Sequence, residues 1–361
     1  MRDDEFLTLA FDLAEMGEGD VSPNPLVGAV IVRDGLLVGR GYHRHFGGPH
    51  AEVFALDEAA ERARGATLYV TLEPCAHFGK TPPCTDRMIQ AGIARVVVAA
   101  EDPNPLVSGR GVAALRAAGI DVEVGRLRDV AMRQNEIFFK YITTRIPFVH
   151  LKLATSLDGR IATRTGDARW ISGEAAQVRV HRWRRRYAAI LVGIKTALID
   201  DPELTVRHVV GRNPVPIVVD PGARLPLTAR LLGGGRRPIL ATARVDPARR
   251  TELEFAGCRV WELPTERGDV DLKLLLERLG EEGVDSVLIE GGGETAASFL
   301  AASLVDRVSF LIAPILIGGR DAVPAIGGLG AERLADAHRL TDISTEWVGS
   351  DLIYSGRVGR A

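Results

Sequence analysis

The sequence predicts an α/β protein of two domains, and three observations support this fold class. Strand-like runs alternate with helix-like runs along the chain, which is typical of sheets covered by helices. The chain has 361 residues, 46% of them hydrophobic and 25% charged, so it is ordinary globular material that is too long for one typical core. The helix-like pattern breaks before Pro147. We therefore expect one domain over 1–145 and another over 146–361.

The first domain is expected to begin with a hairpin and to continue with alternating helices and strands. Asp34-Gly35 predicts the turn of the hairpin. The composition and apolar spacing of 51–64 predict a helix, and 84–92 predicts a shorter helix that ends at glycine. Further helix-like runs cover 112–118 and 127–141. The predicted strands are 26–32, 36–40, 66–71, 94–100 and 120–124.

The second domain is expected to combine strands with intervening helices, and its sharpest feature is a glycine loop. The run Gly291-Gly-Gly293 stands between a strand-like and a helix-like segment. Backbone amides at such a loop and helix start can bind an anion, although a glycine-rich turn alone is not specific. The predicted strands are 148–154, 189–192, 216–220, 238–241, 259–263, 286–290 and 308–313.

Three residues of the first domain form the ligand set of a catalytic zinc site. His50, Cys75 and Cys84 offer the imidazole and thiolate donors that zinc binds, and three protein ligands leave a fourth position for water. Glu52 stands where it can move a proton from that water to a leaving amine. The order matches the base-deaminase signature H-x-E and P-C-x-x-C, except that eight residues separate the cysteines. We expect a hydrolytic deaminase with Glu52 as its catalytic residue.

The local structure around these ligands can also be predicted. His50 and Glu52 fall at the first turn of one helix, and Cys84 opens the next, where the helix dipole is expected to lower the pKa of its thiol. The alternatives are a structural zinc clip, which usually has four protein ligands, or two unrelated core thiols. Cys258 is expected to be a buried strand thiol.

Several further segments resemble the RibD family of bifunctional riboflavin biosynthesis enzymes, over nearly the whole chain. The resemblance implies a cytidine-deaminase-like, three-layer α/β/α fold for the first domain. For the second domain it implies a dihydrofolate-reductase-like α/β fold. The segments that carry it are 22–30, 41–45, 76–83, 152–162, 170–172, 196–207 and 290–293.

For the first domain, the resemblance implies a zinc-dependent deaminase of a pyrimidine that carries a ribose phosphate. Asn24 and His43 would hold the pyrimidine or the ribose, and His77 and Lys80 would lie near the phosphate. Asn24 could instead be only a turn residue, and His43 and His77 could be surface side chains. Four of the eight histidines fall within 43–77, which favours a site.

For the second domain, the resemblance implies an NADPH-dependent reductase. The residues that would line the NADPH site are Ala154, Trp170, Thr196, Asp200, Gly292, Gly293, Glu294, Thr295, Ala296, Ala297 and Ser298. Those that would contact substrate are Lys152, Ala168, Arg184, Leu204, Arg207 and Glu290. Arg184 and Arg207 suit a sugar phosphate because a guanidinium binds phosphate through a bidentate fork. Relatives often carry serine where Ala168 stands, so any contact there would be through the backbone.

The implied chemistry has two steps. The first is hydrolytic deamination of 2,5-diamino-6-ribosylamino-4(3H)-pyrimidinone 5′-phosphate. The second is NADPH-dependent reduction of 5-amino-6-(5-phosphoribosylamino)uracil to the ribitylamino product. Two other classes stay open: a single-activity nucleotide or tRNA deaminase with a non-catalytic second half, and a non-catalytic regulator that binds zinc and nucleotide.

Charge and hydropathy narrow the expected partners and location. With 45 basic and 47 acidic residues the net charge is −2, which gives no bulk attraction to nucleic acid. There is no apolar run of about 18 residues, and the first residues lack the layout of a signal peptide. Three cysteines, two of them needed as thiolates, suit a reducing compartment. We expect a cytoplasmic homo-oligomer with a small-molecule substrate and neither nucleic acid nor membrane as a partner.

Overall fold

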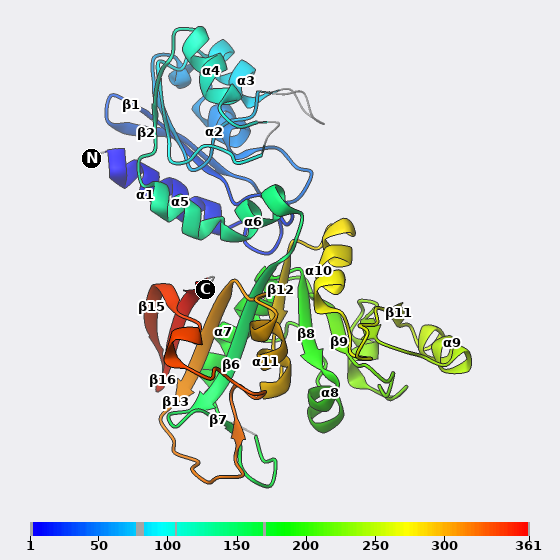
Figure 1. The fold of residues 1–361 in the computed structure, drawn as a ribbon. Coiled ribbons are helices and arrows are strands. Elements are labelled where there is room, and N and C mark those ends of the chain that lie inside the picture. The colour runs from blue at the N-terminus through cyan, green and yellow to red at the C-terminus, as the bar shows by residue number, and fades with distance from the viewer. Residues whose placement is uncertain (1–2, 77–82, 105–106, 169–170, 360–361) are drawn as a thin grey trace. The chain divides into compact units, whose positions relative to one another are not determined.

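The computed structural model describes residues 3–76, 83–104, 107–168 and 171–359. The chain divides into two compact units, Met1–Arg145 and Ile146–Ala361 (Figure 1). Each unit has its own central sheet and its own hydrophobic cores. Both units are therefore α/β structures, which is the fold class that the sequence predicts.

The first unit contains a five-stranded mixed sheet with the order β2-β1-β3-β4-β5. β1 is antiparallel to β2 and β3, whereas β3, β4 and β5 are parallel. The predicted hairpin turn is present, and Asp34 and Gly35 both have positive φ, of 52° and 77°, as a two-residue turn of this kind requires. The strands are β1 Gly28–Arg33, β2 Leu36–Tyr42, β3 Thr67–Val70, β4 Arg95–Val98 and β5 Asp121–Val124.

Helices cover both faces of this sheet and give the unit three layers. Alternation along β1 sends Ala29 and Ile31 into one core and Val30 and Val32 into the other. α2, α3 and α4 pack on the first core, and α1, α5 and α6 pack on the second. The helices are α1 Asp3–Glu15, α2 Ala51–Ala59, α3 Cys84–Ala91, α4 Arg110–Ala117, α5 Arg128–Gln134 and α6 Glu136–Thr144.

Two glycines of β2 bring α2 into direct contact with the strand backbone. A Cβ at Gly39 would lie 2.2 Å from the carbonyl oxygen of Ala55, and a Cβ at Gly41 would lie 2.4 Å from that of Ala51. Contacts this short do not occur between real atoms, so only glycine is compatible with this packing. The position of α2 over the sheet is therefore set by the absence of side chains.

Two predicted helices of the first unit are shorter than the sequence pattern suggests. The helix predicted over 51–64 ends at Ala59, because Ala60 has a φ of 49° and a 3₁₀ turn follows. The stretch 127–141 forms two helices, separated at Asn135. The Asn135 side chain makes hydrogen bonds of 2.8 Å to both the N–H and the carbonyl of Leu26. The Asn135 side chain thus binds a backbone segment that is distant in the sequence, which explains why the helix is interrupted at this residue.

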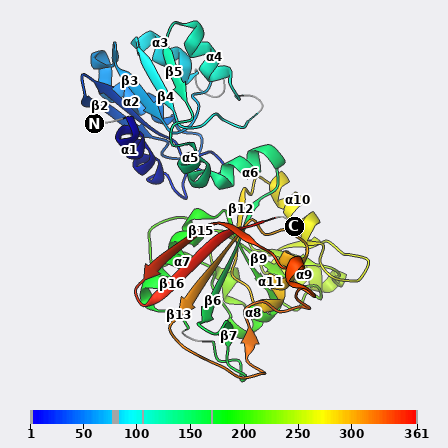
Figure 2. The same cartoon turned by 60° about the vertical axis from the view of Figure 1, so that its left-hand side comes forward.

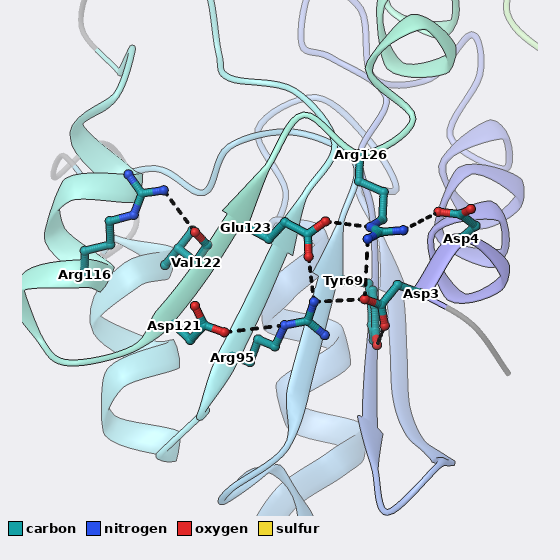
Figure 3. Close-up of polar contacts among 9 residues, drawn as sticks. All are labelled: Asp3, Asp4, Tyr69, Arg95, Arg116, Asp121, Val122, Glu123 and Arg126. Carbon is teal, nitrogen blue, oxygen red and sulfur yellow. Dashed lines mark hydrogen bonds and ion pairs between the residues drawn. The ribbon is translucent and has the colours of Figure 1, made fainter.

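Charged side chains fasten the start of α1 to β4 and β5 (Figure 3). Arg95 on β4 pairs with Asp3 at 2.9 Å and with Glu123 at 2.6 Å. Arg126 extends the cluster to Asp4 at 2.8 Å. Acidic residues in the first turn of a helix also interact favourably with its dipole. The cluster therefore holds the first helix against β4 and β5 of the sheet.

The second unit contains a nine-stranded sheet with the order β11-β10-β9-β8-β12-β6-β13-β16-β15. The first seven strands in this order, from β11 to β13, are parallel to one another. β16 is antiparallel to β13, and β15 is antiparallel to β16. The strands predicted in this half are all present, and the short β7 pairs with β14 outside the main sheet. The bounds are β6 Phe148–Ser156, β7 Arg160–Ala162, β8 Ala189–Gly193, β9 Val215–Val219, β10 Ile239–Thr242, β11 Arg259–Glu262, β12 Ser286–Ile289, β13 Arg307–Ala313, β14 Val323–Pro324, β15 Leu340–Val348 and β16 Asp351–Val358.

Helices also cover both faces of the large sheet. α10 and α11 pack on one core, α8 and α9 pack on another, and α7 packs against β13 and β16. Among the described residues, no helix combines the length and the apolar character needed to cross a membrane. The helices are α7 Glu174–Arg186, α8 Ile194–Asp200, α9 Pro247–Phe255, α10 Leu272–Glu281 and α11 Gly293–Ala301.

The hairpin of β15 and β16 was not predicted from the sequence. The two strands lie side by side at the edge of the sheet, next to β13 (Figure 2). β15 is exposed along most of its length, and Ile343 and Trp347 are 53% and 72% exposed. A strand that buries neither face has no apolar period of two, so the pattern that identifies strands is missing from this segment.

A buried polar chain crosses the second unit between β6, β13 and β16. The two ring nitrogens of His150 lie 2.8 Å from the Tyr187 hydroxyl and 2.7 Å from Ser309 Oγ. Ser309 Oγ lies 2.6 Å from Ser355 Oγ. Burial, together with nearby cationic side chains, lowers the pKa of His150 to about 3. His150 is therefore neutral in the folded protein throughout the physiological pH range.

The neutral state of His150 predicts a loss of stability in acid. Its pKa is about 3 in the folded protein and about 6.5 in the unfolded chain, so between these values the unfolded chain binds more protons. Stability is full above pH 6.5 and falls as the pH drops below it. Between pH 7.5 and 5.5 we expect His150 to contribute about 1.4 kcal/mol of this loss. Urea denaturation followed by tryptophan fluorescence measures it, since all four tryptophans lie in the second unit.

The matched variant is His150→Gln, whose amide can still donate and accept but does not titrate. It should be less stable than the parent at pH 7.5 but should lose about 1.4 kcal/mol less on going to pH 5.5. Identical pH dependence in the two proteins would contradict the assignment.

Candidate active sites

His50, Cys75 and Cys84 converge in the first unit although they come from three segments. His50 is the N-cap residue of α2, Cys75 lies in the loop after β3, and Cys84 is the first residue of α3. Their donor atoms all lie within 4.8 Å of one another, and His50 Nδ1 is 3.2 Å from Cys84 Sγ and 3.5 Å from Cys75 Sγ. Tetrahedral zinc with bonds of about 2.0–2.3 Å would hold such donors about 3.5 Å apart. The cluster fits a zinc ion in both chemistry and dimensions.

Glu52 lies beside this cluster with one oxygen unused. Its side chain is buried, and no described group of the protein makes a hydrogen bond to Oε2. Burial raises the pKa of Glu52, and the charge of His50 opposes that effect. An unpartnered buried carboxylate oxygen is costly unless another group binds it. A water or substrate group next to the donor cluster would be such a partner.

The more acidic thiol of the cluster belongs to Cys75, so the prediction that the helix start lowers the pKa of Cys84 is wrong. The Cys84 N–H donates to Cys75 Sγ at 3.4 Å, so the positive end of α3 acts on Cys75. The hydrogen bond between the two thiols lowers the pKa of Cys75 and raises that of Cys84. The Cys75 sulfur in turn raises the pKa of His50 to about 9. Metal binding must displace the remaining protons from this cluster.

Asn24 and His43 lie next to each other and next to the donor cluster. Asn24 Nδ2 is 3.0 Å from His43 Nε2, and His43 Nδ1 is 3.0 Å from the carbonyl oxygen of Pro49. The Pro49 carbonyl can only accept, so Nδ1 carries the proton and Nε2 accepts from the amide. Burial lowers the pKa of His43, and its ring centroid is 5.7 Å from that of His50. The structure therefore brings both predicted substrate contacts to the edge of the candidate zinc site.

Asn135 supports this edge and was not found by sequence reasoning. Its side chain binds both backbone groups of Leu26, two residues after Asn24. The two partners are 109 residues apart in the sequence. A polar residue in the middle of an amphipathic stretch was the one available signal, and it does not identify the partner.

Lys152, Arg184 and Glu290 form a buried ion cluster in the second unit. Arg184 donates through Nε to Glu290 Oε1 at 2.7 Å and through Nη2 to Oε2 at 2.9 Å, and Lys152 Nζ is 3.7 Å from Oε2. Burial opposes ionisation of Glu290, but the two cations lower its pKa to about 2. Burial lowers the pKa of Lys152. The fork of Arg184 is therefore engaged by Glu290 in this structure, whereas the sequence reasoning assigned it to a phosphate.

Arg207 is the more accessible of the two predicted phosphate anchors. Its side chain is 49% exposed and donates through Nη1 to Glu203 Oε2 at 2.6 Å. Its backbone N–H donates to Nδ1 of His181 at 3.0 Å. Burial lowers the pKa of His181 to about 4, which keeps this acceptor neutral. Leu204, in the same loop, is buried with a φ of 55°, so the loop has a strained conformation that His181 and Glu203 help to hold.

The glycine loop lies where the parallel strands β8 and β12 end side by side. A Cβ at Gly193, the last residue of β8, would lie 2.3 Å from Thr295 Oγ1, and a Cβ at Gly292 would lie 3.5 Å from Thr196 Oγ1. Helix α11 begins at Gly293 without a side-chain cap, so its first N–H groups can face a ligand. Ligands of open α/β sheets bind at such strand ends. This bare backbone suits a phosphate-bearing cofactor such as NADPH.

The remaining predicted contacts of the second unit differ in accessibility. Ala154 and Ala168 are half-buried, and Asp200 is exposed at the end of α8. Ala296 is fully buried in the core, so its side chain faces away from any ligand. The other residues predicted to line the NADPH site lie in the first two turns of α11; they are Gly293, Glu294, Ala297 and Ser298. His77, Lys80 and Trp170 lie outside the described residues.

A zinc-sized donor set beside a buried carboxylate is the arrangement of a hydrolytic deaminase, and glycine-lined strand ends beside a buried ion cluster suit a nucleotide-dependent reductase. Comparison with protein families agrees with both assignments. Residues 1–100 match the cytidine and deoxycytidylate deaminase zinc-binding region, and residues 147–354 match the RibD C-terminal domain. The chain belongs to the RibD family of riboflavin biosynthesis proteins.

Individual relatives are similar over almost their whole length. The riboflavin biosynthesis protein RibD of Aquifex aeolicus is 44% identical over 352 residues, which cover 97% of each chain. The structure of Acinetobacter baumannii RibD has a TM-score of 0.88 at 38% identity and covers 99% of each chain. A Thermotoga maritima diaminohydroxyphosphoribosylaminopyrimidine deaminase/5-amino-6-(5-phosphoribosylamino)uracil reductase has a TM-score of 0.86 at 36% identity, with the same coverage. These similarities confirm the predicted fold class and the family resemblance.

Because the ion cluster is buried, we expect that a neutral residue at position 290 will strongly reduce the stability of the second unit. Glu290→Gln leaves the Lys152 and Arg184 cations buried beside an amide, so we expect the second unit to lose about 3–5 kcal/mol of unfolding free energy. Urea denaturation followed by tryptophan fluorescence measures this loss. The matched control is Glu252→Gln, which removes an exposed partner of Arg249 and should cost no more than about 0.5 kcal/mol. Equal losses in the two variants would argue against the buried cluster.

Proposed function

We propose that this chain is a bifunctional enzyme of riboflavin biosynthesis. Its first reaction is hydrolytic deamination of 2,5-diamino-6-ribosylamino-4(3H)-pyrimidinone 5′-phosphate. Its second is NADPH-dependent reduction of 5-amino-6-(5-phosphoribosylamino)uracil to the ribitylamino product. The observation that carries the proposal is the convergence of His50, Cys75 and Cys84 beside Glu52, on a chain that also carries the RibD C-terminal domain. Within the part of the chain that the structure describes, Glu52 Oε2 has no hydrogen-bond partner.

The deaminase site is assigned to the domain formed by residues 1–145. His50, Cys75 and Cys84 would hold zinc, which activates a water molecule for attack on an amine-bearing ring carbon when it is bound. Glu52 would move a proton from the attacking water to the departing amine, and its buried Oε2 and raised pKa support this role. Asn24 and His43 would orient the pyrimidine or ribose. By the family resemblance, His77 and Lys80 would lie near the phosphate of the substrate.

The reductase site is assigned to the domain formed by residues 146–361. NADPH, when bound, supplies the hydride, and the protein binds and orients the two reactants. The glycine loop and Thr196 would hold the cofactor. The half-exposed Arg207 is suited to the sugar phosphate, and Lys152 and Glu290 would contact the sugar. The residues assigned to the cofactor are Ala154, Trp170, Thr196, Asp200 and 292–298, and those assigned to substrate are Lys152, Ala168, Arg184, Leu204, Arg207 and Glu290.

A coupled assay with Glu52→Gln tests the proposal. The zinc-loaded parent, given the diaminopyrimidine substrate, should release ammonia and then oxidise NADPH. The variant should release ammonia at least about 100-fold more slowly, because it lacks the proton-transferring carboxylate. When the deaminated substrate is supplied directly, the variant should oxidise NADPH at the parent rate. Parallel recording of ammonia and of absorbance at about 340 nm, where NADPH absorbs, measures both steps.

Each failure of this assay points to a different part of the proposal. Ammonia release without NADPH oxidation, even with deaminated substrate, would leave a single-activity deaminase with a non-catalytic second half. Undiminished ammonia release by Glu52→Gln would remove the assigned role of Glu52.

We also propose that the protein is a homo-oligomer in which β15 pairs with a second copy of this chain. β15 is the edge strand of the nine-stranded sheet and exposes Ile343 and Trp347. An exposed edge strand with apolar side chains is a template for pairing, and a strand can pair with its own copy about a two-fold axis. A second copy would cover both the unpaired backbone and the apolar side chains.

Light scattering during size-exclusion chromatography tests this assembly. The parent is expected to be a dimer or a larger oligomer, and Trp347→Glu should shift it towards smaller species because a charge would be buried against the partner. Phe255→Glu is the matched control, since Phe255 is 94% exposed at the end of α9. A monomeric parent, or equal shifts in both variants, would rule out pairing through β15.

A further inference from the structure

Glu73 is a buried carboxylate two residues before Cys75, and its side chain accepts four hydrogen bonds from one distant segment. Its side chain is only 4% exposed. Oε1 accepts from the backbone N–H of Gly111 at 2.9 Å and of Val112 at 3.1 Å. Oε2 accepts from the N–H of Gly109 at 3.0 Å and of Asp102 at 3.2 Å. Four backbone donors from the segment 102–112 thus converge on one side chain.

Glu73 supplies the N-terminal cap that α4 lacks. The N-cap residue of α4 is Gly109, which has no side chain to satisfy the first N–H groups of the helix. The N–H groups of Gly111 and Val112 belong to that first turn, and Glu73 binds both. A carboxylate at a helix N-terminus also interacts favourably with the helix dipole, and hydrogen bonds to a charged acceptor are stronger than neutral ones. The contact between Glu73 and α4 is therefore a strong one.

The same contact fixes the peptide that leads to Cys75. A Cβ at Gly111 would lie 1.9 Å from the carbonyl oxygen of Pro74, so α4 packs directly on the Pro74 peptide. The Glu73 N–H donates to the carbonyl of Ala100 at 2.9 Å, which ties the same residue to the chain just after β4. Cys75 is consequently held from its N-terminal side by α4 and the sheet. On its other side it is held by α3, through the Cys84 N–H.

We propose that Glu73 is a positioning residue of the candidate zinc site. It docks α4 on the Glu73-Pro74-Cys75 segment and so sets the position of Cys75 Sγ relative to His50 and Cys84. The inference rests on the zinc site of the proposed deaminase and assigns to it a supporting residue that contacts no ligand itself. Residues that orient metal ligands in this way typically change metal affinity about 10- to 100-fold when they are replaced.

Glu73→Gln tests the proposal with little change of shape. The amide turns one acceptor oxygen into an NH₂ group, which then faces two backbone N–H donors, and it removes the negative charge that interacts favourably with the dipole of α4. We expect zinc affinity, measured by competition with a chelator, to fall at least about tenfold. In the cobalt-substituted protein, the absorption bands of the metal-thiolate centre should shift, because the Cys75 sulfur moves. A merely structural role would leave the spectrum of the bound state unchanged.

The matched control is Glu123→Gln in the same unit. Glu123 accepts from Arg95 and Arg126 in the cluster of Figure 3, and neither of these partners belongs to α4 or to the Glu73-Pro74-Cys75 segment. This variant should lose stability and keep the zinc affinity and the cobalt spectrum of the parent. Equal losses of zinc affinity in the two variants, or an unchanged spectrum for Glu73→Gln, would overturn the proposal.

A second variant addresses the possibility that Glu73→Gln does not fold. Gly111→Ala keeps the carboxylate and its charge but adds the Cβ that meets the Pro74 carbonyl, so it displaces α4 from the other side of the contact. The same weakening of zinc binding and the same spectral shift are expected, and parent-like values would overturn the proposal. If the parent itself binds no zinc, the proposed deaminase fails, and that outcome is distinct from parent-like behaviour of the variants.

Discussion

The first unit depends on the meeting of two helix starts around the Cys75 sulfur. α2 begins after His50 and α3 begins at Cys84, and the sulfur lies within reach of both. Two thiols and an imidazole at this separation share protons and charge in a mostly buried place, which costs free energy that a bound cation would offset. The fold maintains the cluster through rigid supports: the sheet, the glycine contacts of β2, and α4.

The second unit is organised around the end of a single strand. β12 leads directly into Glu290, which pairs with Lys152 and Arg184, and then into the glycines that open α11. In the proposed function, one turn of the chain therefore connects the substrate site with the cofactor site. Hydride transfer requires the two reactants to be held close together in a fixed orientation. Consecutive residues on a buried strand end provide such a connection without relying on a mobile loop.

The sequence was most informative where chemistry restricts the choice of residue. Histidine, two cysteines and a glutamate in a fixed order point to zinc chemistry, and buried parallel strands have long apolar runs. It was less informative where the backbone is the partner. The donors that bind Glu73 and the Leu26 peptide that binds Asn135 have no side-chain signature, and both partners are distant in the sequence. The exposed β15 lacked any apolar period, and the thiol that faces the start of α3 is set by the direction of one N–H group.

The glycines of β2 link the two chemical roles of α2. His50 and Glu52 stand at the start of a helix whose carbonyl groups rest on Gly39 and Gly41, with no side chain between helix and strand. A methyl group at either glycine would lift the helix as a rigid body, so the metal ligand and the proton carrier would move together and in the same direction. A substitution at either glycine therefore changes the metal ligand and the proton carrier at the same time, and neither can be adjusted alone from this side of the helix.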